Sequence, residues 1–373
     1  MKKVYVSYCL FLMLAIVVTF PCSIYAQHKN LSLRGDLHFG AVLPEYSNFV
    51  YLVNEPVFSG EISLVKQSFG KNPWEKLYKY PEGGITLQFT TLGNRDVFGY
   101  EFALFPYVQT PFIRKDNFIF YNQFGLGLGY ATKKFDLENN FQNVSVGSHL
   151  NVHFNFKLGT KLKLSSTTWL NSGVSFTHYS NANMSEPNLG LNLATLYTGL
   201  TQIIHPTPER INVPDEAHQP KHEFAFILAA GGKHTRALQS TVYFTSSASI
   251  EYKHHSFKKL HFGGGLDLSY DSSTETEMSA PGKNDYKPAY DYRTGIHFSQ
   301  ELVYDRFSFI LQEGLYFGLT DQVSKSPMYN RAILRWKLNP SFLVHVSMRS
   351  HLHILEYPEI GFGYFLLKQR HEK

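Results

Sequence analysis

The sequence is short of cysteine, and this excludes a disulfide-stabilised or thiol-dependent protein. Only two of its 373 residues are cysteines, and both Cys9 and Cys22 lie near the start of the chain. The segment that holds them begins with basic residues, continues with an apolar stretch and ends in the small residue Ala26, which is typical of a secretory signal peptide. We therefore expect residues 1–26 to be removed, and the mature protein to contain neither a disulfide bond nor a thiol group.

Charge and long apolar stretches are also scarce. Charged residues make up 17% of the chain, and its net charge of +5 falls to +3 without the signal segment, which carries two lysines and no acid. So mild a charge does not indicate nucleic-acid binding. After the signal segment, no apolar stretch reaches the ~20 residues that a transmembrane helix needs.

Aromatic residues, in contrast, are abundant. They account for 16% of the chain, with 31 Phe and 24 Tyr. Between residues 144 and 158, apolar and polar side chains alternate, as they do in a strand that has lipid on one side and a polar lumen on the other. The fold class we predict is therefore all-β, a transmembrane antiparallel β-barrel; the alternative is a soluble secreted all-β protein. The apolar face holds Leu150, Val152, Phe154, Phe156 and Leu158, and the polar face holds His149, Asn151, His153, Asn155 and Lys157.

The candidate strands fall into two groups. Eight lie in residues 27–204 and about eight in residues 222–373, on either side of residues 205–221, a segment rich in proline and charge that we interpret as a linker or a periplasmic loop. We favour one barrel of about 16 strands, with 12–16 in range, because an open half-barrel would leave a strand edge in lipid. The alternative is two eight-stranded units.

One strand in the first group ends in polar residues on its apolar face. We expect a tight turn at Gly159–Thr160, followed by a strand whose apolar row ends in His178 and Ser180. Such a polar pair is tolerated near the membrane interface more readily than in the hydrocarbon. Short turns face the periplasm in outer-membrane barrels, so a short turn at 159–160 places the pair at the outer-leaflet rim.

These residues carry a resemblance to a known family. The stretch resembles the signature of the lipid A 3-O-deacylases, the PagL family of outer-membrane barrels, and the resemblance covers about residues 31–204. The matching residues are His178-Tyr179-Ser180-Asn181-Ala182, followed by Pro187-Asn188 and Gly190.

The resemblance implies a serine esterase. Ser180 would be the nucleophile, and His178 would take its proton and pass it to the leaving alcohol. An acidic residue of the next strand orients the histidine in that family, and the corresponding position here is Asn192, whose amide oxygen can still accept from the imidazole. Asn181 and Asn188, with nearby backbone N–H groups, are candidates for the oxyanion site. Glu186, in the intervening loop, is an alternative orienting residue.

The function we predict is removal of an ester-linked acyl chain from lipid A of lipopolysaccharide at the outer leaflet of the bacterial outer membrane. Two alternatives are a catalytically inactive barrel that serves as a pore or scaffold, and a porin whose later half conducts small solutes. Lipid A and outer-membrane lipids are the expected partners, with no nucleic acid. No cofactor or metal ion is implied, and the sequence does not predict an oligomeric state.

Overall fold

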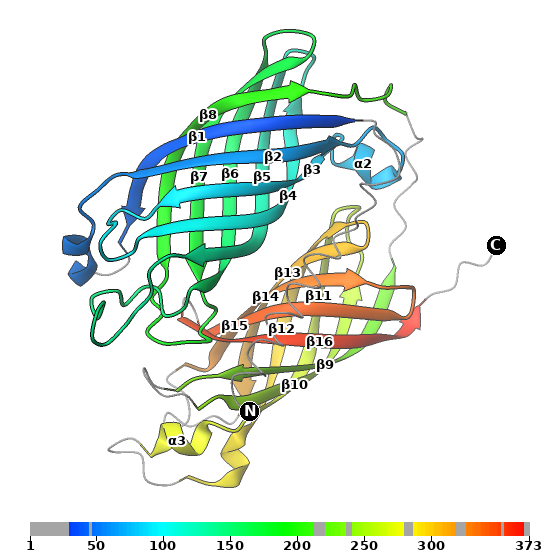
Figure 1. The fold of residues 1–373 in the computed structure, drawn as a ribbon. Helices are drawn as coiled ribbons and strands as arrows, with labels where there is room; N and C mark the ends of the chain where they lie inside the picture. Colours follow the sequence, from blue (N-terminus) through cyan, green and yellow to red (C-terminus); the bar gives the residue numbers. More distant parts are fainter. Residues whose placement is uncertain are drawn as a thin grey trace. The chain divides into compact units, whose positions relative to one another are not determined.

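The computed structural model shows an all-β chain that forms two closed antiparallel barrels (Figure 1). The predicted signal segment lies outside the described residues, and none of the described helices is both long and apolar enough to cross a membrane. The structure describes residues 30–44, 47–211, 221–235, 241–279, 286–317, 326–351 and 354–368.

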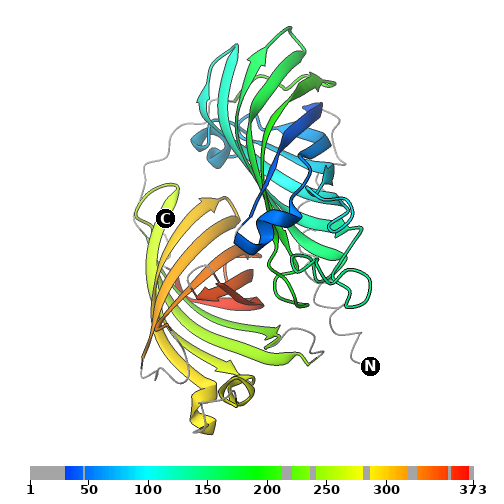
Figure 2. The same cartoon turned by 90° about the vertical axis from the view of Figure 1, so that its left-hand side faces the viewer.

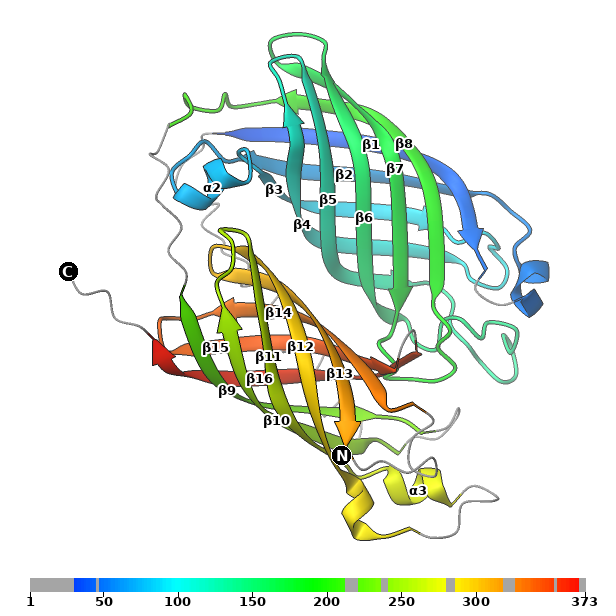
Figure 3. The same ribbon diagram turned by 180° about the vertical axis from the view of Figure 1, so that it is seen from behind.

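The first barrel is a continuous up-and-down sheet of eight strands that closes where β8 pairs with β1. Strands β5 to β8 lie side by side on the wall seen in Figure 3. A 3-10 helix, η2 (Ser47–Leu52), follows β1, and a short helix, α2 (Pro73–Leu77), lies between β2 and β3. The strands are β1 (Leu31–Leu43), β2 (Val57–Gln67), β3 (Glu82–Thr91), β4 (Tyr100–Arg114), β5 (Phe118–Ala131), β6 (Leu150–Lys163), β7 (Thr168–Ser180) and β8 (Leu191–Ile203).

The second barrel repeats this plan with another eight strands and closes where β16 pairs with β9. In Figure 2 the strands of each barrel curve around the lumen of that barrel. Helix α3 (Thr274–Met278) and the 3-10 helix η3 (Pro288–Asp291) lie between β11 and β12. The strands are β9 (His222–Lys233), β10 (Tyr243–His254), β11 (Leu260–Asp271), β12 (Tyr292–Tyr304), β13 (Phe307–Phe317), β14 (Met328–Lys337), β15 (Phe342–His351) and β16 (Ile354–Lys368).

Two closed barrels correct our preference for a single barrel of about 16 strands. The premise, that no strand edge can be left in lipid, holds for either arrangement, because β1 pairs with β8 and β9 pairs with β16 over most of their lengths. The two-unit alternative is the arrangement observed. The alternation of apolar and polar residues is a property of a single strand, so it did not reveal which strands pair to close the sheet.

Both walls are apolar outside and polar inside. On β1, for example, Leu37 is 72% exposed on the outer face, whereas its neighbours Asp36 and His38 are buried in the lumen. The polar row predicted between residues 151 and 157 also points inward and is buried. The alternation therefore predicted correctly which side chains face the lumen.

A buried charge network fills the middle of the first lumen. Lys157 from β6 lies 3.3 Å from Asp36 of β1 and also pairs with Glu61 of β2. Arg34 lies 3.4 Å from Asp36 and 3.5 Å from Glu61. These four side chains have no exposed surface, so the lumen at this level is occupied by side chains that neutralise one another.

The second lumen is filled in the same way. Asp267 of β11 lies 3.1 Å from Arg331 of β14 and 2.7 Å from His297 of β12. One layer away, Arg335 lies 2.9 Å from Glu251 and has no exposed side-chain surface. Each barrel thus has its own interior of paired charges.

The tight turn predicted at Gly159–Thr160 is wrong, because β6 continues to Lys163 and the chain turns at residues 164–167. Gly159 is paired with Gly173 of β7, and a Cβ atom at either position would collide with the hydroxyl of Tyr197. That hydroxyl bonds to Tyr121 across the lumen at 2.8 Å. The glycine therefore makes room for a lumenal tyrosine and does not mark a turn.

Candidate active site

The predicted site residues meet at the end of the first barrel where β7 finishes and β8 begins. In this antiparallel pair, His178 is directly opposite Asn192. Ser180 follows on the same face of β7, and all three side chains are half-buried on the outward side of the wall. The fully buried Tyr179, between His178 and Ser180, points inward and packs with Phe98 and Leu191. The outward placement predicted for His178 and Ser180 is thus confirmed.

A chain of hydrogen bonds joins the three side chains. The Nδ1 atom of His178 lies 2.7 Å from Oδ1 of Asn192, and its Nε2 atom lies 3.2 Å from Oγ of Ser180. An amide oxygen only accepts, so Nδ1 carries the proton, which leaves the Nε2 lone pair free to accept from the serine hydroxyl. Ser180 and His178 are therefore arranged as the nucleophile and base of a serine hydrolase are. His178 contacts Asn192 through Nδ1. Asn192 therefore takes the orienting position that we considered for Glu186.

Gly190 holds the pair from one side, in a role that the sequence alone did not indicate. Its φ angle is +74°, a left-handed conformation that side chains rarely adopt. A Cβ atom at Gly190 would lie 2.9 Å from Cε1 of His178 and 3.3 Å from Cβ of Ser180. The backbone of this residue is thus packed directly against both reacting side chains. The available signal was a glycine just before the strand that carries Asn192.

The two oxyanion candidates bond to each other. The backbone N–H of Asn181 donates to Oδ1 of Asn188 at 2.9 Å. This bond ties the residue after the serine to the far side of the loop, while Ala182 and Asn183 turn the chain with φ angles of +53° and +62°. The backbone N–H of Asn181 is thus engaged, and Asn188 holds the loop next to the serine. The amide NH₂ group of Asn188 is the donor that its side chain still offers.

The loop between β5 and β6 supports the same site. The backbone N–H of Gly190 donates to the carbonyl of Ser145 at 3.0 Å, and that of Leu189 donates to Val144 at 3.2 Å. The fully buried Asn143 anchors this segment, since its side chain donates to the carbonyl of Val97 at 3.0 Å and accepts from the N–H of Val146 at 3.2 Å. Our sequence analysis missed this brace, because its partners are far apart in the chain.

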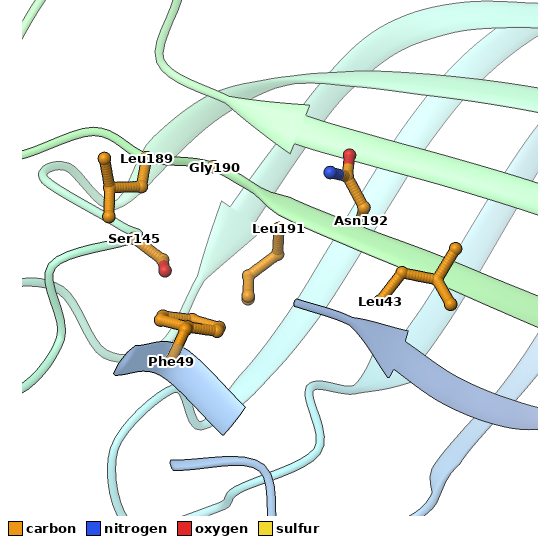
Figure 4. Close-up of a pocket in the computed structure, with 7 residues that line it drawn as sticks. All are labelled: Leu43, Phe49, Ser145, Leu189, Gly190, Leu191 and Asn192. Carbon is orange, nitrogen blue, oxygen red and sulfur yellow. The ribbon is translucent and has the colours of Figure 1, made fainter. Parts of the chain in front are cut away.

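A small pocket adjoins the site on the side of β8 and β1. Figure 4 shows Leu43 and Asn192 at one end of it, Phe49 and Ser145 at the other, and Leu191 between them. Its lining combines leucine and phenylalanine side chains with the polar Ser145 and Asn192. Within the described residues, no group of three or more His, Cys, Asp or Glu side chains could hold a metal ion. The lining residues are Leu43, Phe49, Ser145, Leu189, Gly190, Leu191 and Asn192.

Comparison with protein-family models gives two matches that together span most of the chain. The model described as lipid A 3-O-deacylase (PagL) matches residues 59–201, which include the His178, Ser180 and Asn192 positions. The model described as the acyloxyacyl hydrolase C-terminal domain matches residues 222–369, which include every strand of the second barrel. No curated protein matches the chain.

Solved structures with some likeness share little sequence with this chain. The toluene transporter TodX of Pseudomonas putida is 9% identical, with 94% of this chain and 92% of that chain covered and a TM-score of 0.17. OccAB4 of Acinetobacter baumannii is 8% identical, with 91% and 98% covered and a TM-score of 0.25. At TM-scores this low, neither likeness bears on the activity of this chain.

Proposed function

Because the chain belongs to the lipid A 3-O-deacylase (PagL) family, we propose that it is an outer-membrane serine esterase that removes an ester-linked fatty acyl chain from lipid A. The observation that carries this proposal is the hydrogen-bonded series Ser180–His178–Asn192 on the outward face of the wall. A hydroxyl on that face meets lipid, whereas one in the lumen would meet water.

In the first half of the reaction, the Ser180 oxygen attacks the ester carbonyl carbon and its proton moves to Nε2 of His178. The carbonyl oxygen becomes an oxyanion, for which the Asn188 amide group is a candidate donor. When the intermediate collapses, the bond from the carbonyl carbon to the sugar oxygen breaks, and Nε2 returns the proton to that oxygen. The products are a free sugar hydroxyl and an acyl-serine.

In the second half, water attacks the acyl-serine and His178 again accepts the proton. The bond to Ser180 breaks, the serine oxygen regains the proton, and the fatty acid leaves. Asn192 keeps Nδ1 protonated throughout, which fixes the tautomer that this cycle needs. As a neutral amide it stabilises the imidazolium less than a carboxylate would.

The outer leaflet is the side we propose for the reaction. The end of the first barrel that carries Ser180 also carries the connections at residues 44–56, 92–99 and 132–149, whereas two of the connections at the other end are the short turns 115–117 and 164–167. In outer-membrane barrels the longer loops face outward and the short turns face the periplasm. This loop asymmetry supports an outward site, with residues 68–81 as the one long connection at the opposite end.

The test is mass spectrometry of lipid A from cells that express the wild-type chain or Ser180→Ala. We expect cells with the wild type to contain lipid A lacking one acyl chain, and the variant to leave lipid A intact, because the substitution removes the hydroxyl that bonds to Nε2 of His178. Ser350→Ala, at the corresponding place in the second barrel, is the matched control and should behave as the wild type. Identical lipid A with the wild type and Ser180→Ala would refute the esterase.

An inactive barrel is the second candidate, and the amide at Asn192 in place of an acid is the observation that favours it. A conducting pore is disfavoured, because buried side chains such as Arg34, Lys157 and Arg335 occupy the two lumens. We therefore expect no steady conductance in planar bilayers, whichever outcome the lipid A experiment has.

A further inference from the structure

The outward face of the second barrel is mainly apolar, but it carries a short row of polar side chains. No contact in the described structure explains why these side chains are polar. On β13 the outward side chains are Phe307, Phe309, Leu311, Glu313, Leu315 and Phe317. Glu313 is the exception in this row. The other acidic side chains of the described strands point into a lumen or toward its mouth.

Two polar residues of the neighbouring strands lie level with Glu313 in the sheet. Glu313 is directly opposite Asn330 of β14, and Asn330 is directly opposite Ser350 of β15. Directly opposed side chains on one face of an antiparallel sheet have Cβ atoms about 5 Å apart. A carboxylate, an amide and a hydroxyl therefore lie side by side on the outer surface of the wall. We call these three residues the outward polar row.

The described structure offers the row no neutralising partner. None of its hydrogen bonds or ion pairs involves Glu313, and the buried Oδ1 atom of Asn330 has no hydrogen-bond partner. Arg331 and Arg349, the chain neighbours of Asn330 and Ser350, point into the lumen, where Arg331 pairs with Asp267 at 3.1 Å. These two cations of the described strands thus lie on the wrong face to reach Glu313.

The other neighbours of Glu313 are apolar. Leu311 and Leu315 flank it on its own strand, and Phe298 is opposite on β12. All three are largely exposed, so the carboxylate has apolar side chains on three sides and Asn330 on the fourth. A charged group on a lipid-facing wall is disfavoured unless it is paired, and acidic or basic residues at such positions mark a functional site by default.

We propose that Glu313, Asn330 and Ser350 bind the ammonium headgroup of a membrane lipid. A primary ammonium group supplies three N–H donors, which match the carboxylate, the free amide oxygen and the hydroxyl of the row. The position along the strands suits a headgroup, because Asn330 and Ser350 lie within two residues of the strand ends. The site is independent of the deacylase reaction, since none of its residues belongs to the first barrel.

The test uses the full chain in micelles with equal amounts of phosphatidylethanolamine and phosphatidylcholine, and native mass spectrometry to measure the lipid that remains bound. The two lipids have the same charge, but only the first has N–H donors in its headgroup. We expect the wild-type chain to retain phosphatidylethanolamine over phosphatidylcholine by roughly threefold or more, as befits a partly exposed ion pair. Glu313→Gln should bring the ratio close to one, and Asn330→Leu should lower it.

Gln300→Leu is the matched control, because Gln300 is an outward polar residue of β12 that lies outside the row. This variant and Ser180→Ala should both keep the wild-type preference, which separates this site from the deacylase. Fluorescence of Trp336, on β14, in chains whose other two tryptophans are replaced by phenylalanine, checks that each second-barrel variant is folded. Equal retention of the two lipids by the wild type would overturn the proposal, as would a preference that survives Glu313→Gln. A change in subunit number with Glu313→Gln and no lipid preference would overturn it in favour of a contact between copies of the chain.

Discussion

The two barrels have the same architecture and differ at one rim. In the first, β7 ends with His178 and Ser180 on the outward face, and Asn192 of β8 is opposite the histidine. The half-buried ring is held at both nitrogens, by the amide oxygen and the serine hydroxyl. This rim therefore carries the proposed nucleophile and base.

At the corresponding place in the second barrel, the order of strands brings β15 and β16 together. The outward residues at the end of β15 are Met348 and Ser350, and Pro358 of β16 is opposite Met348. A serine stands where Ser180 stands in the first barrel, but a thioether and a proline ring replace the imidazole and the amide. Neither can accept the proton of a hydroxyl.

This difference separates the features that stabilise a barrel from those on which the proposed reaction depends. Closure of the sheet, the apolar outer wall and the lumen of paired charges occur in both barrels, so they account for folding and not for chemistry. The proposed chemistry depends on three side chains and on the loop that positions them. The comparison can therefore be tested by changing one barrel at a time.

The largest effect should follow removal of the base. We expect His178→Ala to lower kcat by about 10⁴-fold or more, because the serine loses its proton acceptor. Met348→Ala, the matched change in the second barrel, should leave kcat unchanged. Release of fatty acid from lipid A measures both. A loss with Met348→Ala equal to that with His178→Ala would show that the two rims do not differ in function.

The next effect concerns stability, and here we expect the barrels to behave alike but separately. Lys157→Met removes one of the two cations, Lys157 and Arg34, that Asp36 and Glu61 share, and should cost about 3 kcal/mol, as breaking a buried ion pair does. Arg335→Met should destabilise the second barrel by a similar mechanism. Fluorescence in denaturant is measured in chains that keep a single tryptophan, Trp169 for the first barrel or Trp336 for the second, with the other two tryptophans replaced by phenylalanine.

We expect each substitution to lower the unfolding midpoint that its own barrel's tryptophan reports, and to leave the other nearly unchanged, because each sheet closes on itself. Equal shifts of both midpoints with either variant would mean that the two barrels unfold as one unit.

A third test concerns the loop before β8. Gly190→Ala should lower kcat by roughly 10- to 100-fold, because a methyl group at this position displaces His178 by a few tenths of an ångström and strains the backbone. Gly99→Ala is the control, since Gly99 has a φ angle of +70° and lies in another loop of the same barrel. If both variants lose stability and only Gly190→Ala loses kcat, the contact with His178 is responsible. Equal activity losses would assign the effect to strain alone.

The smallest effect should come from the orienting residue. Asn192→Leu removes the acceptor at 2.7 Å from Nδ1 and should lower kcat by about tenfold, whereas Asn192→Asp places a carboxylate there and should raise it by a similar factor. Pro358→Ala, the matched change in the second barrel, should leave kcat unchanged. No difference among the three residues at position 192 would show that Asn192 does not orient the histidine.

Much of the wall was predictable from the sequence because the pleat imposes a period of two residues. The sequence predicted two groups of about eight strands, which the described residues contain, and the outward position of His178 follows from counting along one of those strands. Gly159 misled the prediction, since a glycine reads as a turn unless the lumenal Tyr197 above it is known. Closure into two barrels was undetermined for a similar reason, because it depends on pairing between β1 and β8 that no local pattern encodes.

The site was predictable in part. His178, Ser180 and Asn192 were found by strand register and by resemblance to a family motif, and the structure brings all three together. The supports of Gly190 were not found, because Ser145 and Val144 bond to the motif loop through backbone atoms, which leave no trace in side-chain identity. The outward Glu313 was visible as a break in an apolar row, but its neighbours on β14 and β15 required the register.

The outward orientation of Ser180 also determines which substrate concentration governs the rate of encounter. A lipid that reaches the hydroxyl along the wall arrives by lateral diffusion in two dimensions, so its effective concentration is the number of lipid A molecules per unit area of membrane. Turnover would then follow the mole fraction of lipid A in the leaflet and be nearly indifferent to the amount of membrane in the suspension. Adding inert phospholipid or detergent would act as a competitive diluent, even though it never binds the serine.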